Sequence, residues 1–486
     1  MFSVLRVAAT LFLLTTGATV CIAASRPNIV VVVADDLGYG DLACFGSEIV
    51  KTPHLDQFAR EGMKLTSCYS AASNCSPSRT GLMTGRTPYR VGVHGAIPFN
   101  SPTHVRESEI TIATLLQQTG YTTCHVGKWH LNGKFNSPEQ PQPNDHGFDD
   151  WFSTQNNALP NHKHPDNFVR NGQPVGKIND YAANIVADEA IRWLDESRDK
   201  TKPFFLYVCF HEPHEPIATD PKFAQQYPSD DPSFSAYHGN IAQMDNAFGR
   251  LMQKLDQFNL RENTCVLFTS DNGPAVTAMH PHGSAGPLRG KKGDLYDGGI
   301  RVPGIVRWPE HVPAGSESDQ PVSGVDLLPS LCEITGTAPP ADRTLDGSSV
   351  VPIFGGRDIQ RDKPLYWQYN YTRTAPKVAV RRGDWKLLAA LDAEAPKTPD
   401  ITDEKTHVMK TAGLTGFELY NLKTDIGETT ELSASHPDVF QSLKTELLEI
   451  YRQVQSETPR WPAWKHERYE AGRIIWPDYW LNKIKK

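Results

Sequence analysis

The sequence has no excess of positive charge, and this narrows the range of partners. It holds 49 Lys and Arg residues against 56 Asp and Glu residues, a formal net charge of -7 over 486 residues. The one basic run is the short tail at residues 483–486. Domains that bind nucleic acid instead concentrate Lys and Arg on one face. We therefore expect no nucleic-acid partner.

Long apolar runs are also missing, apart from one near the N-terminus. Residues 7–20 are mostly apolar, but the run is too short to span a membrane. Arg6 precedes it and the small residues Ala23 and Ala24 follow it, an order typical of a cleaved export signal. The sequence therefore predicts a signal peptide at residues 1–24, an exported protein that is periplasmic or secreted, and no stable membrane insertion.

Cysteine is sparse, with eight residues in the chain. Seven remain after removal of the predicted signal, an odd number for a disulfide framework. Cys124, Cys209 and Cys265 lie inside apolar runs, where cysteines are commonly buried thiols, so these residues need not form disulfides. Glycosylation sequons begin only at Asn74 and Asn370, and so few in an exported chain favour a bacterial source.

Apolar runs rich in β-branched residues alternate with amphipathic stretches through the first two thirds of the chain. This alternation predicts an α/β fold with a large sheet covered by helices on both faces. The expected strands are residues 28–34, 121–126, 204–210 and 264–269. The expected helices are residues 112–120, 180–196 and 237–258.

The pattern changes near residue 361. Four short strands, at residues 366–369, 378–380, 385–388 and 417–420, and a helix at 439–454 predict a small antiparallel sheet with a packed helix. We therefore divide the mature chain into a catalytic domain at 25–360 and a C-terminal subdomain at 361–486. Residues 397–416 are expected to be an exposed loop.

Polar side chains follow each of the four predicted strands of the large sheet. They are Asp35 and Asp36, Lys128 and His130, His211 and His214, and Asp271 and Asn272. Ligands bind at the carboxyl ends of the strands in open α/β sheets. These four clusters are therefore expected to converge on one site.

The stretch around Cys75 offers the groups of an anion site. Pro77 and its neighbouring serines predict the start of a helix, which places Cys75 at the helix N-terminus. Free amides and the helix dipole favour an anion there, and Arg79 lies one turn further on to pair with it. The sequence therefore combines a nucleophile position, an anion site and a cation within five residues.

The run Cys75-Ser76-Pro77-Ser78-Arg79, followed by Thr80-Gly81-Leu82-Met83-Thr84-Gly85-Arg86, resembles the signature of type I sulfatases. The resemblance implies the large mixed sheet of the alkaline phosphatase superfamily. It also implies that Cys75 is oxidised to formylglycine, whose hydrated aldehyde is the nucleophile. A formylglycine-generating or equivalent maturation enzyme is then an expected partner.

Asp35, Asp36, Asp271 and Asn272 form an all-oxygen set of the kind that suits Ca²⁺ or Mg²⁺. In the resembled family two such pairs, in this order, hold a divalent cation, usually calcium, together with the modified cysteine. The resemblance therefore implies a Ca²⁺ site, with Mg²⁺ as the alternative, at these four residues and Cys75.

Further segments match the same family. Lys128 and His130 are implied to bind sulfate and to orient the hydrated aldehyde. His214, within a Pro-His-x-Pro segment, is implied to be a general acid or a sulfate ligand, and Lys292 is implied to bind sulfate. The spacing and prolines of residues 211–216 do not fit the zinc motif His-Glu-x-x-His. Asp297 stands where the family usually has a glutamate.

The irregular stretch at residues 131–178 is expected to rim the site, because long loops at strand ends commonly carry function. His162, His164 and Arg170 in this stretch, with His211, are candidates to bind a sugar. The alternatives are a solvated loop and, for His211, a buried neighbour of the site.

These observations predict an exported sulfatase that hydrolyses sulfate esters, on a sulfated saccharide substrate. Two alternatives remain open from the sequence. One is a phosphate-ester or phosphonate hydrolase of the same superfamily. The other is a non-catalytic protein that binds sulfated glycans through an unconverted Cys75.

Overall fold

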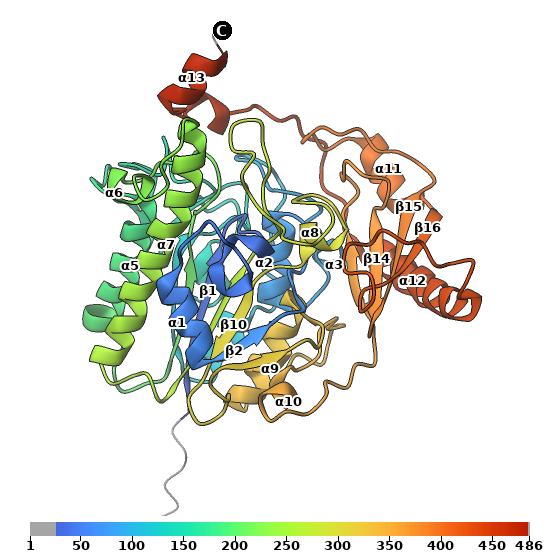
Figure 1. Ribbon diagram of the computed structural model, residues 1–486, viewed down its shortest axis with the longest axis horizontal. Helices are drawn as coiled ribbons and strands as arrows, with labels where there is room; N and C mark the ends of the chain where they lie inside the picture. Colours follow the sequence, from blue (N-terminus) through green and yellow to red (C-terminus); the bar gives the residue numbers. More distant parts are fainter. Residues whose placement is uncertain (1–25, 485–486) are drawn as a thin grey trace, which may run out of the picture.

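The computed structural model describes residues 26–484, so the predicted export signal lies outside the described residues. Its centre is a ten-stranded mixed sheet in the order β11-β2-β10-β9-β1-β8-β4-β5-β6-β7 (Figure 1). The strands are β1 (Asn28–Ala34), β2 (Met63–Leu65), β4 (Thr122–Lys128), β5 (Asp150–Thr154), β6 (Val169–Arg170), β7 (Gln173–Pro174), β8 (Phe204–Cys209), β9 (Thr264–Ser270), β10 (Gly304–Arg307) and β11 (Ser316–Ser318). The five strands from β9 to β5 are parallel, and β10 is antiparallel to β9.

The central strand β1 is buried on both faces, and its alternating side chains belong to two separate cores. Val30 and Val32 pack with helices α1 (Pro53–Glu61), α5 (Ala182–Arg192) and α7 (Pro232–Gln257). Val31 and Val33 pack with the helices of the opposite face. Those helices are α2 (Cys75–Thr84), α3 (Pro88–Val91), α4 (Ile112–Gln118), α9 (Leu327–Thr335) and α10 (Val351–Phe354). This continuous apolar run is what a sheet covered on both faces requires, and the predicted fold class is confirmed.

Two helices differ from their predicted bounds for local reasons. Helix α7 begins at Pro232, because Asp231 accepts a hydrogen bond from the Ser233 amide and proline fits the first helical position. Helix α5 keeps regular geometry from Ala182 to Arg192 and continues as a π-helical turn at Trp193–Ser197. The predicted strands of the large sheet agree with the structure to within two residues.

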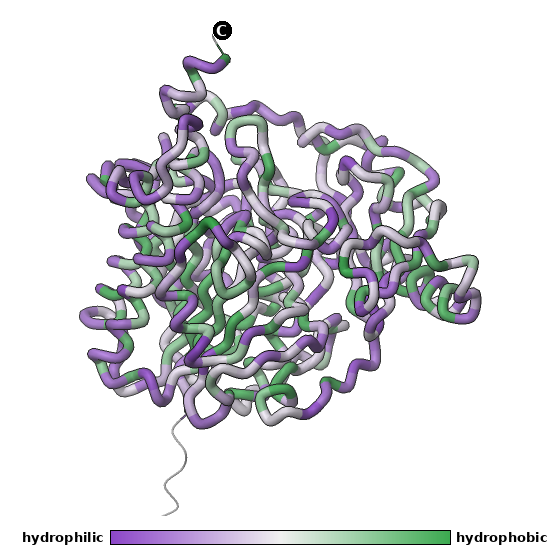
Figure 2. Tube along the Cα trace, viewed as in Figure 1, coloured by the Kyte–Doolittle hydropathy of each residue, from purple (hydrophilic) through white to green (hydrophobic). Residues whose placement is uncertain are grey.

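The C-terminal part contains a four-stranded antiparallel sheet. Its strands are β13 (Leu365–Gln368), β14 (Val378–Arg382), β15 (Trp385–Leu391) and β16 (Leu414–Asn421). Helix α12 (Pro437–Glu457) covers one face through Leu443, Leu447 and Val454. The other face packs on the large-sheet domain, where Trp367 contacts Tyr69. Apolar segments accordingly gather between the small sheet and α12 and along the large sheet, whereas the outer loops are hydrophilic (Figure 2).

The expectation of a loop at residues 397–416 is wrong. This stretch contains helix α11 (Asp403–Thr411). The Thr402 side chain accepts a hydrogen bond from the Lys405 amide, and Val408 and Met409 are buried. A threonine N-cap followed by acidic residues is a helix start that the sequence contained.

The chain after α12 returns to the large-sheet domain. Glu470 accepts a hydrogen bond from Asn156, and the Tyr479 hydroxyl lies 2.7 Å from Nε2 of His280. The last helix, α13 (Asp478–Ile484), lies at the end of α7 (Figure 1). Within residues 26–484, no helix has the length and apolar character needed to cross a membrane. The seven cysteines of this range are free, and six of them are buried.

A fully buried ion cluster joins the two parts. Lys386 of β15 lies 2.8 Å from Asp297, which begins the short helix α8 (Asp297–Ile300), and 2.8 Å from Glu428. Asp297 also accepts a hydrogen bond from the Tyr69 hydroxyl, at 2.7 Å. Burial raises the pKa of Glu428, whereas for Asp297 the combined charges of Lys386, Arg301 and Arg381 outweigh burial and lower the pKa. Lys386 thus contacts both buried carboxylates at the junction, and Arg301 also pairs with Asp297, at 3.4 Å.

Replacing this lysine is expected to destabilise the junction. Lys386→Met leaves Glu428 without its ion-pair partner and Asp297 with Arg301 as its remaining one, and breaking buried ion pairs in this way costs about 3–5 kcal/mol of unfolding free energy. Without the ammonium, burial holds the folded-state pKa of Glu428 further above its unfolded value, and the pKa of Asp297 rises from its lowered value. The loss of unfolding free energy is therefore greatest at high pH, and it shrinks as the pH falls and the carboxylates take up protons. Thermal unfolding at pH 8 and pH 5 measures this difference.

The control is Lys423→Met, at a side chain that is 75% exposed. Exposed substitutions of this kind change stability by about 0.5 kcal/mol or less. A Lys386→Met variant with the wild-type melting temperature at pH 8 would contradict the role given to the cluster.

Candidate active site

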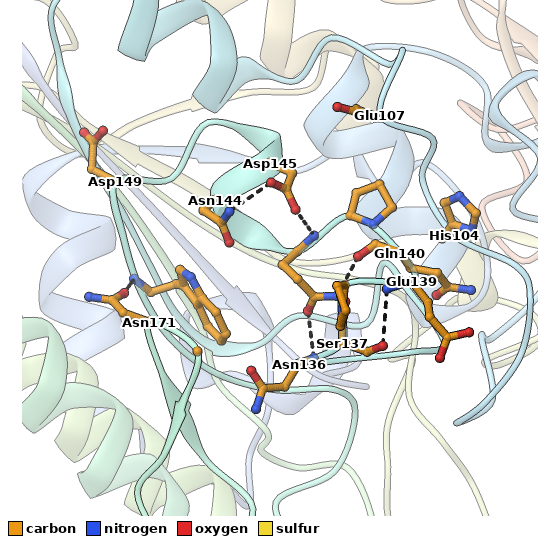
Figure 3. Close-up of a pocket in the computed structure, with 15 residues that line it drawn as sticks. His104, Glu107, Asn136, Ser137, Glu139, Gln140, Asn144, Asp145, Asp149 and Asn171 are labelled. Carbon is orange, nitrogen blue, oxygen red and sulfur yellow. Dashed lines mark hydrogen bonds between the residues drawn. The ribbon is translucent and has the colours of Figure 1, made fainter.

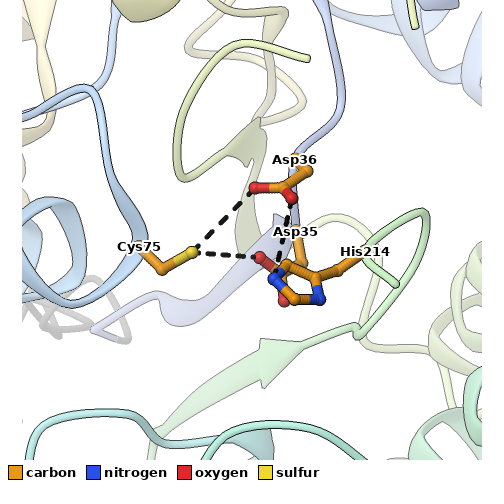
Figure 4. A group of neighbouring side chains, drawn as sticks. All are labelled: Asp35, Asp36, Cys75 and His214. Carbon is orange, nitrogen blue, oxygen red and sulfur yellow. Dashed lines mark hydrogen bonds and ion pairs between the residues drawn. The ribbon is translucent and has the colours of Figure 1, made fainter. Parts of the chain in front are cut away.

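The polar residues that follow β1, β4, β8 and β9 meet at one edge of the sheet, against the start of α2. Ligand atoms of Asp35, Asp36, Cys75 and His214 all lie within 4.8 Å of one another (Figure 4). The parallel strands bring the acids and the histidine to this edge, and α2 brings Cys75. Residues far apart in sequence therefore form one buried cluster.

Three cations surround the acids. Nζ of Lys128 lies 2.6 Å from Asp35, and Nζ of Lys292 lies 2.6 Å from Asp36 and 3.3 Å from Sγ of Cys75. The guanidinium of Arg79 lies 2.8 Å from Asp271. Lys128 is fully buried. Burial acts to raise the pKa of Asp35, but the combined charges of Lys128, His214, Arg79 and Lys292 lower it. The site is thus a dense, largely buried arrangement of alternating charges.

Cys75 is the first residue of α2 and is only 2% exposed. Burial raises the pKa of its thiol to about 12, although Lys128 and Lys292 act in the opposite direction. An unmodified Cys75 is therefore a neutral thiol at ordinary pH, and a neutral thiol is a poor nucleophile. The next residue, Ser76, accepts a hydrogen bond from the Ile97 amide and fixes the neighbouring loop.

The four oxygen-bearing residues fit a hard divalent cation. Oδ1 of Asn272 is buried and has no hydrogen-bond partner within residues 26–484, while its Nδ2 donates to Asp36 at 2.8 Å. Burial, and then the charge of Asp35, raises the pKa of Asp271 to about 7. Three buried carboxylates and an unpartnered amide oxygen form the ligand set that Ca²⁺ or Mg²⁺ prefers. Asp35, Asp36, Asp271 and Asn272 could hold such an ion beside Cys75.

Two histidines present a ring nitrogen to the cluster. Nε2 of His130 lies 3.1 Å from the carbonyl of Ile97 and must donate to it, so its buried Nδ1 carries a lone pair. Burial lowers the pKa of His130, which favours the neutral ring. His214 donates through Nδ1 to the carbonyl of Glu215, and its Nε2 lies 3.7 Å from Asp36. One nitrogen of each ring is thereby free for proton transfer.

The structure brings only some of the predicted sugar-binding residues to this site. His211 lies 2.8 Å from Thr154, and its ring centroid is 5.8 Å from that of the fully buried His162. Both rings are buried and do not lie on the surface. His164 is half-buried, and its backbone adopts a positive φ of 56°. Arg170 lies elsewhere, paired with Glu189 of α5 at 2.5 Å.

Sequence reasoning missed residues that reach the site from distant segments. Tyr369 follows strand β13, and a Cβ placed on Gly293, next to Lys292, would be 3.8 Å from its ring. His280 lies 2.8 Å from Glu215, the residue that follows His214. No local motif marks either residue, because a single tyrosine or histidine in a loop carries no pattern. Their placement depends on the packing of the small sheet and the C-terminal segment.

A large pocket lies outside this cluster, beside residues 136–145 (Figure 3). Its volume is about 940 Å³, and its lining includes Glu107, Glu139, Asp145 and Asp149. Within the described residues, this lining contains no lysine or arginine. A surface with four carboxylates and no cation repels sulfate. The smaller, cation-rich cluster at Cys75 is therefore the site suited to a sulfate ester.

Comparison with known proteins agrees with this geometry. The Sulfatase family model matches residues 27–337, and the model described as N-sulphoglucosamine sulphohydrolase, C-terminal, matches residues 291–453. The chain is 33% identical to arylsulfatase A of Homo sapiens over 87% of each chain. It is 30% identical to the N-acetylgalactosamine-6-O-sulfatase of Bacteroides thetaiotaomicron, over 87% of this chain and 93% of that one.

Solved structures give the same picture. The crystal structure of Ps i-CgsB in complex with k-i-k-neocarrahexaose is 28% identical, with a TM-score of 0.77, and the match covers 95% of this chain and 98% of that chain. The phosphonate monoester hydrolase of Agrobacterium radiobacter, at 20% identity and a TM-score of 0.62, shares the fold. The resemblance seen in the sequence is confirmed: the chain belongs to the sulfatase family and is a sulfuric ester hydrolase.

Proposed function

We propose that this protein is an exported hydrolase of sulfated carbohydrates that uses a formylglycine made from Cys75 and a divalent cation, Ca²⁺ or Mg²⁺. The observation that carries this proposal is the meeting of Arg79, Lys128 and Lys292 with three carboxylates around Cys75. A tetrahedral, negatively charged sulfate group is held well by several cations in a largely buried site. The predicted leader and the relatives that act on sugars support export and a saccharide substrate.

The chain's own residues account for binding and proton transfer. Lys292 contacts Sγ of Cys75, Lys128 contacts Asp35 and Arg79 contacts Asp271, and these three cations would neutralise the sulfate. His214, when protonated on both ring nitrogens beside Asp36, would donate a proton from Nε2 to the leaving sugar oxygen, and Nδ1 of His130 would accept one from the hydrated aldehyde. The bound cation would polarise a sulfate oxygen, and the oxidised Cys75 would supply the attacking hydroxyl. A side chain with only one hydroxyl at position 75 would keep the sulfate bound, because it has no second hydroxyl to expel it.

The modified cysteine gives the first test. Cys75→Ala should reduce turnover by about a thousandfold or more, the scale seen when a nucleophile is lost. The melting temperature should stay close to that of the wild type, because only a sulfur atom is removed. The mass of the peptide containing residue 75 of the wild type should show aldehyde rather than thiol. The matched control is Cys332→Ala, at a buried free thiol on α9. Near-normal turnover by Cys75→Ala would refute the assignment.

The metal ligands give the second test. Asp271→Asn should lower bound calcium or magnesium and turnover together, by more than the 10–100-fold or so that follows loss of an outer partner of a metal ligand. Metal content is measured by elemental analysis of the purified protein. Asp145→Asn, in the acidic pocket, removes a carboxylate without touching the cluster and should change neither quantity. Full metal content in Asp271→Asn would show that the oxygen set was misassigned.

Substrate preference gives the third test. Sulfate release is compared for an aryl sulfate, an aryl phosphate with the same aryl group, and a series of sulfated mono- and oligosaccharides that differ in sulfate position. We expect at least one sugar sulfate to exceed the aryl sulfate in kcat/KM, and the aryl phosphate to be the poorest. A phosphate preference would favour the phosphate-ester alternative. Binding of sulfated sugars without any release would favour the non-catalytic one.

A further inference from the structure

A second cavity lies between the large-sheet domain and the small sheet. Its volume is about 410 Å³, within the range of roughly 300–1,000 Å³ typical of small-molecule sites. One wall is the loop at residues 94–103. The opposite wall is formed by residues 369–373 and by the segment around α11. The cavity therefore exists only because the two parts of the chain pack together.

The wall of this cavity is shared with the active site. The Ile97 carbonyl accepts the hydrogen bond from His130, and the Ile97 amide donates to Ser76, next to Cys75. Tyr369, on the other wall, packs near Gly293, and its hydroxyl has a pKa raised to about 12 by burial, with the charges of Lys292 and Arg373 acting against that rise. Tyr369 therefore stands between a lysine of the sulfate site and an arginine of the cavity.

The charge of this cavity differs from that of the chain. Arg373 and Lys397 are exposed in its lining, and within residues 26–484 neither side chain forms an ion pair or a hydrogen bond. Asp400 is the one carboxylate in the described lining, and it accepts a hydrogen bond from the His466 amide. The protein as a whole has a formal net charge of -7. Two cationic side chains with no ion-pair partner among the described residues thus face a cavity beside the sulfate site.

Aromatic rings give the cavity rigid walls. The rings of Tyr369 and Tyr371 lie 5.8 Å apart at 81°, and Lys405 lies 4.8 Å from the Tyr371 centroid. The Lys405 ammonium donates to backbone carbonyls, so this lysine supports the wall. The indole of Trp461 is held by a hydrogen bond to the Gly92 carbonyl, at 2.7 Å. Flat aromatic surfaces with a few polar groups can accommodate one sugar ring.

We propose that this cavity binds the sugar next to the sulfated one, and that Arg373 and Lys397 select a neighbour carrying a second anionic group, a carboxylate or a sulfate. The inference rests on the proposed function, because it extends the substrate of the same site from one sugar to an acidic oligosaccharide. The acidic pocket at residues 136–145 would repel such a chain, so the substrate runs from the sulfate site toward the small sheet.

Binding is tested in Cys75→Ala protein, which does not consume the probe. Two pairs of probes are compared. The first pair is the disaccharide of N-acetylgalactosamine 6-sulfate and glucuronic acid, and the methyl ester of that disaccharide. In the second pair, the sugar next to the sulfated one either carries a sulfate or carries none. Titration calorimetry should show tighter binding of the charged member of at least one pair, by about five- to tenfold at low salt, with the difference shrinking as salt rises. The pair whose two members differ in affinity shows whether the recognised group is a carboxylate or a sulfate.

The double variant Arg373→Ala/Lys397→Ala in this background should lose most of that discrimination. Arg373→Lys, which keeps a charge, should retain part of it. The control Lys423→Ala removes an exposed lysine on the same part of the chain, outside the cavity, and should keep the wild-type ratio. Equal affinity for both members of each pair, no binding of any probe, or an unchanged ratio in the double variant would overturn the inference.

Turnover by the unsubstituted protein separates this inference from the proposed function. If it releases sulfate from saccharides but binding shows no charge discrimination, the subsite is refuted and the sulfatase proposal stands. If it releases no sulfate from any compound, the proposed function fails, and the binding ratio still decides whether the cavity recognises acidic sugars.

Discussion

The burial of three carboxylates at one edge of the sheet is the constraint on which the rest of this structure depends. Asp35, Asp36 and Asp271 are each no more than 2% exposed. Ionised acids this close are strongly unfavourable without cations, because their repulsion grows as water is removed. Lys128, Lys292 and Arg79 supply part of the balance. A divalent metal would supply the rest, and the unpartnered oxygen of Asn272 points to the same need.

Holding these charges requires a rigid frame. The acids follow central strands with apolar contacts on both faces, where a shift of one residue would reverse every side chain. Lys292 does not follow a strand of the sheet. Its loop is held in place by two backbone hydrogen bonds, from the Lys292 amide to the Pro274 carbonyl and from the Gly293 amide to the Ser73 carbonyl. The Asp297–Lys386–Glu428 cluster then joins the end of this loop to the small sheet. The small sheet thus takes part in positioning a cation of the active site.

The distribution of charge over the molecule also follows from this arrangement. The formal net charge is -7, yet cations gather at the Cys75 cluster and in the cavity beside it, while the pocket at residues 136–145 is acidic. A negatively charged substrate would experience a favourable field along one path and an unfavourable one along the other. Asp297, one methylene shorter than the glutamate usual in the family, still reaches Lys386 at 2.8 Å and Tyr69 at 2.7 Å.

The sequence by itself determined the fold class, the family and the positions of the main strands along the chain, since apolar periodicity and the motif at Cys75 are local properties. Local chemistry was also enough to mark Asp35, Lys128, His214 and Asp271 as residues that follow strands. Only the tertiary structure decided the rest. It placed Arg170 on Glu189, buried His162 behind His211, and brought Tyr369 and Arg373 to the edge of the site. These contacts depend on how segments separated in the chain pack against one another, and single-residue spacing carries no record of that packing.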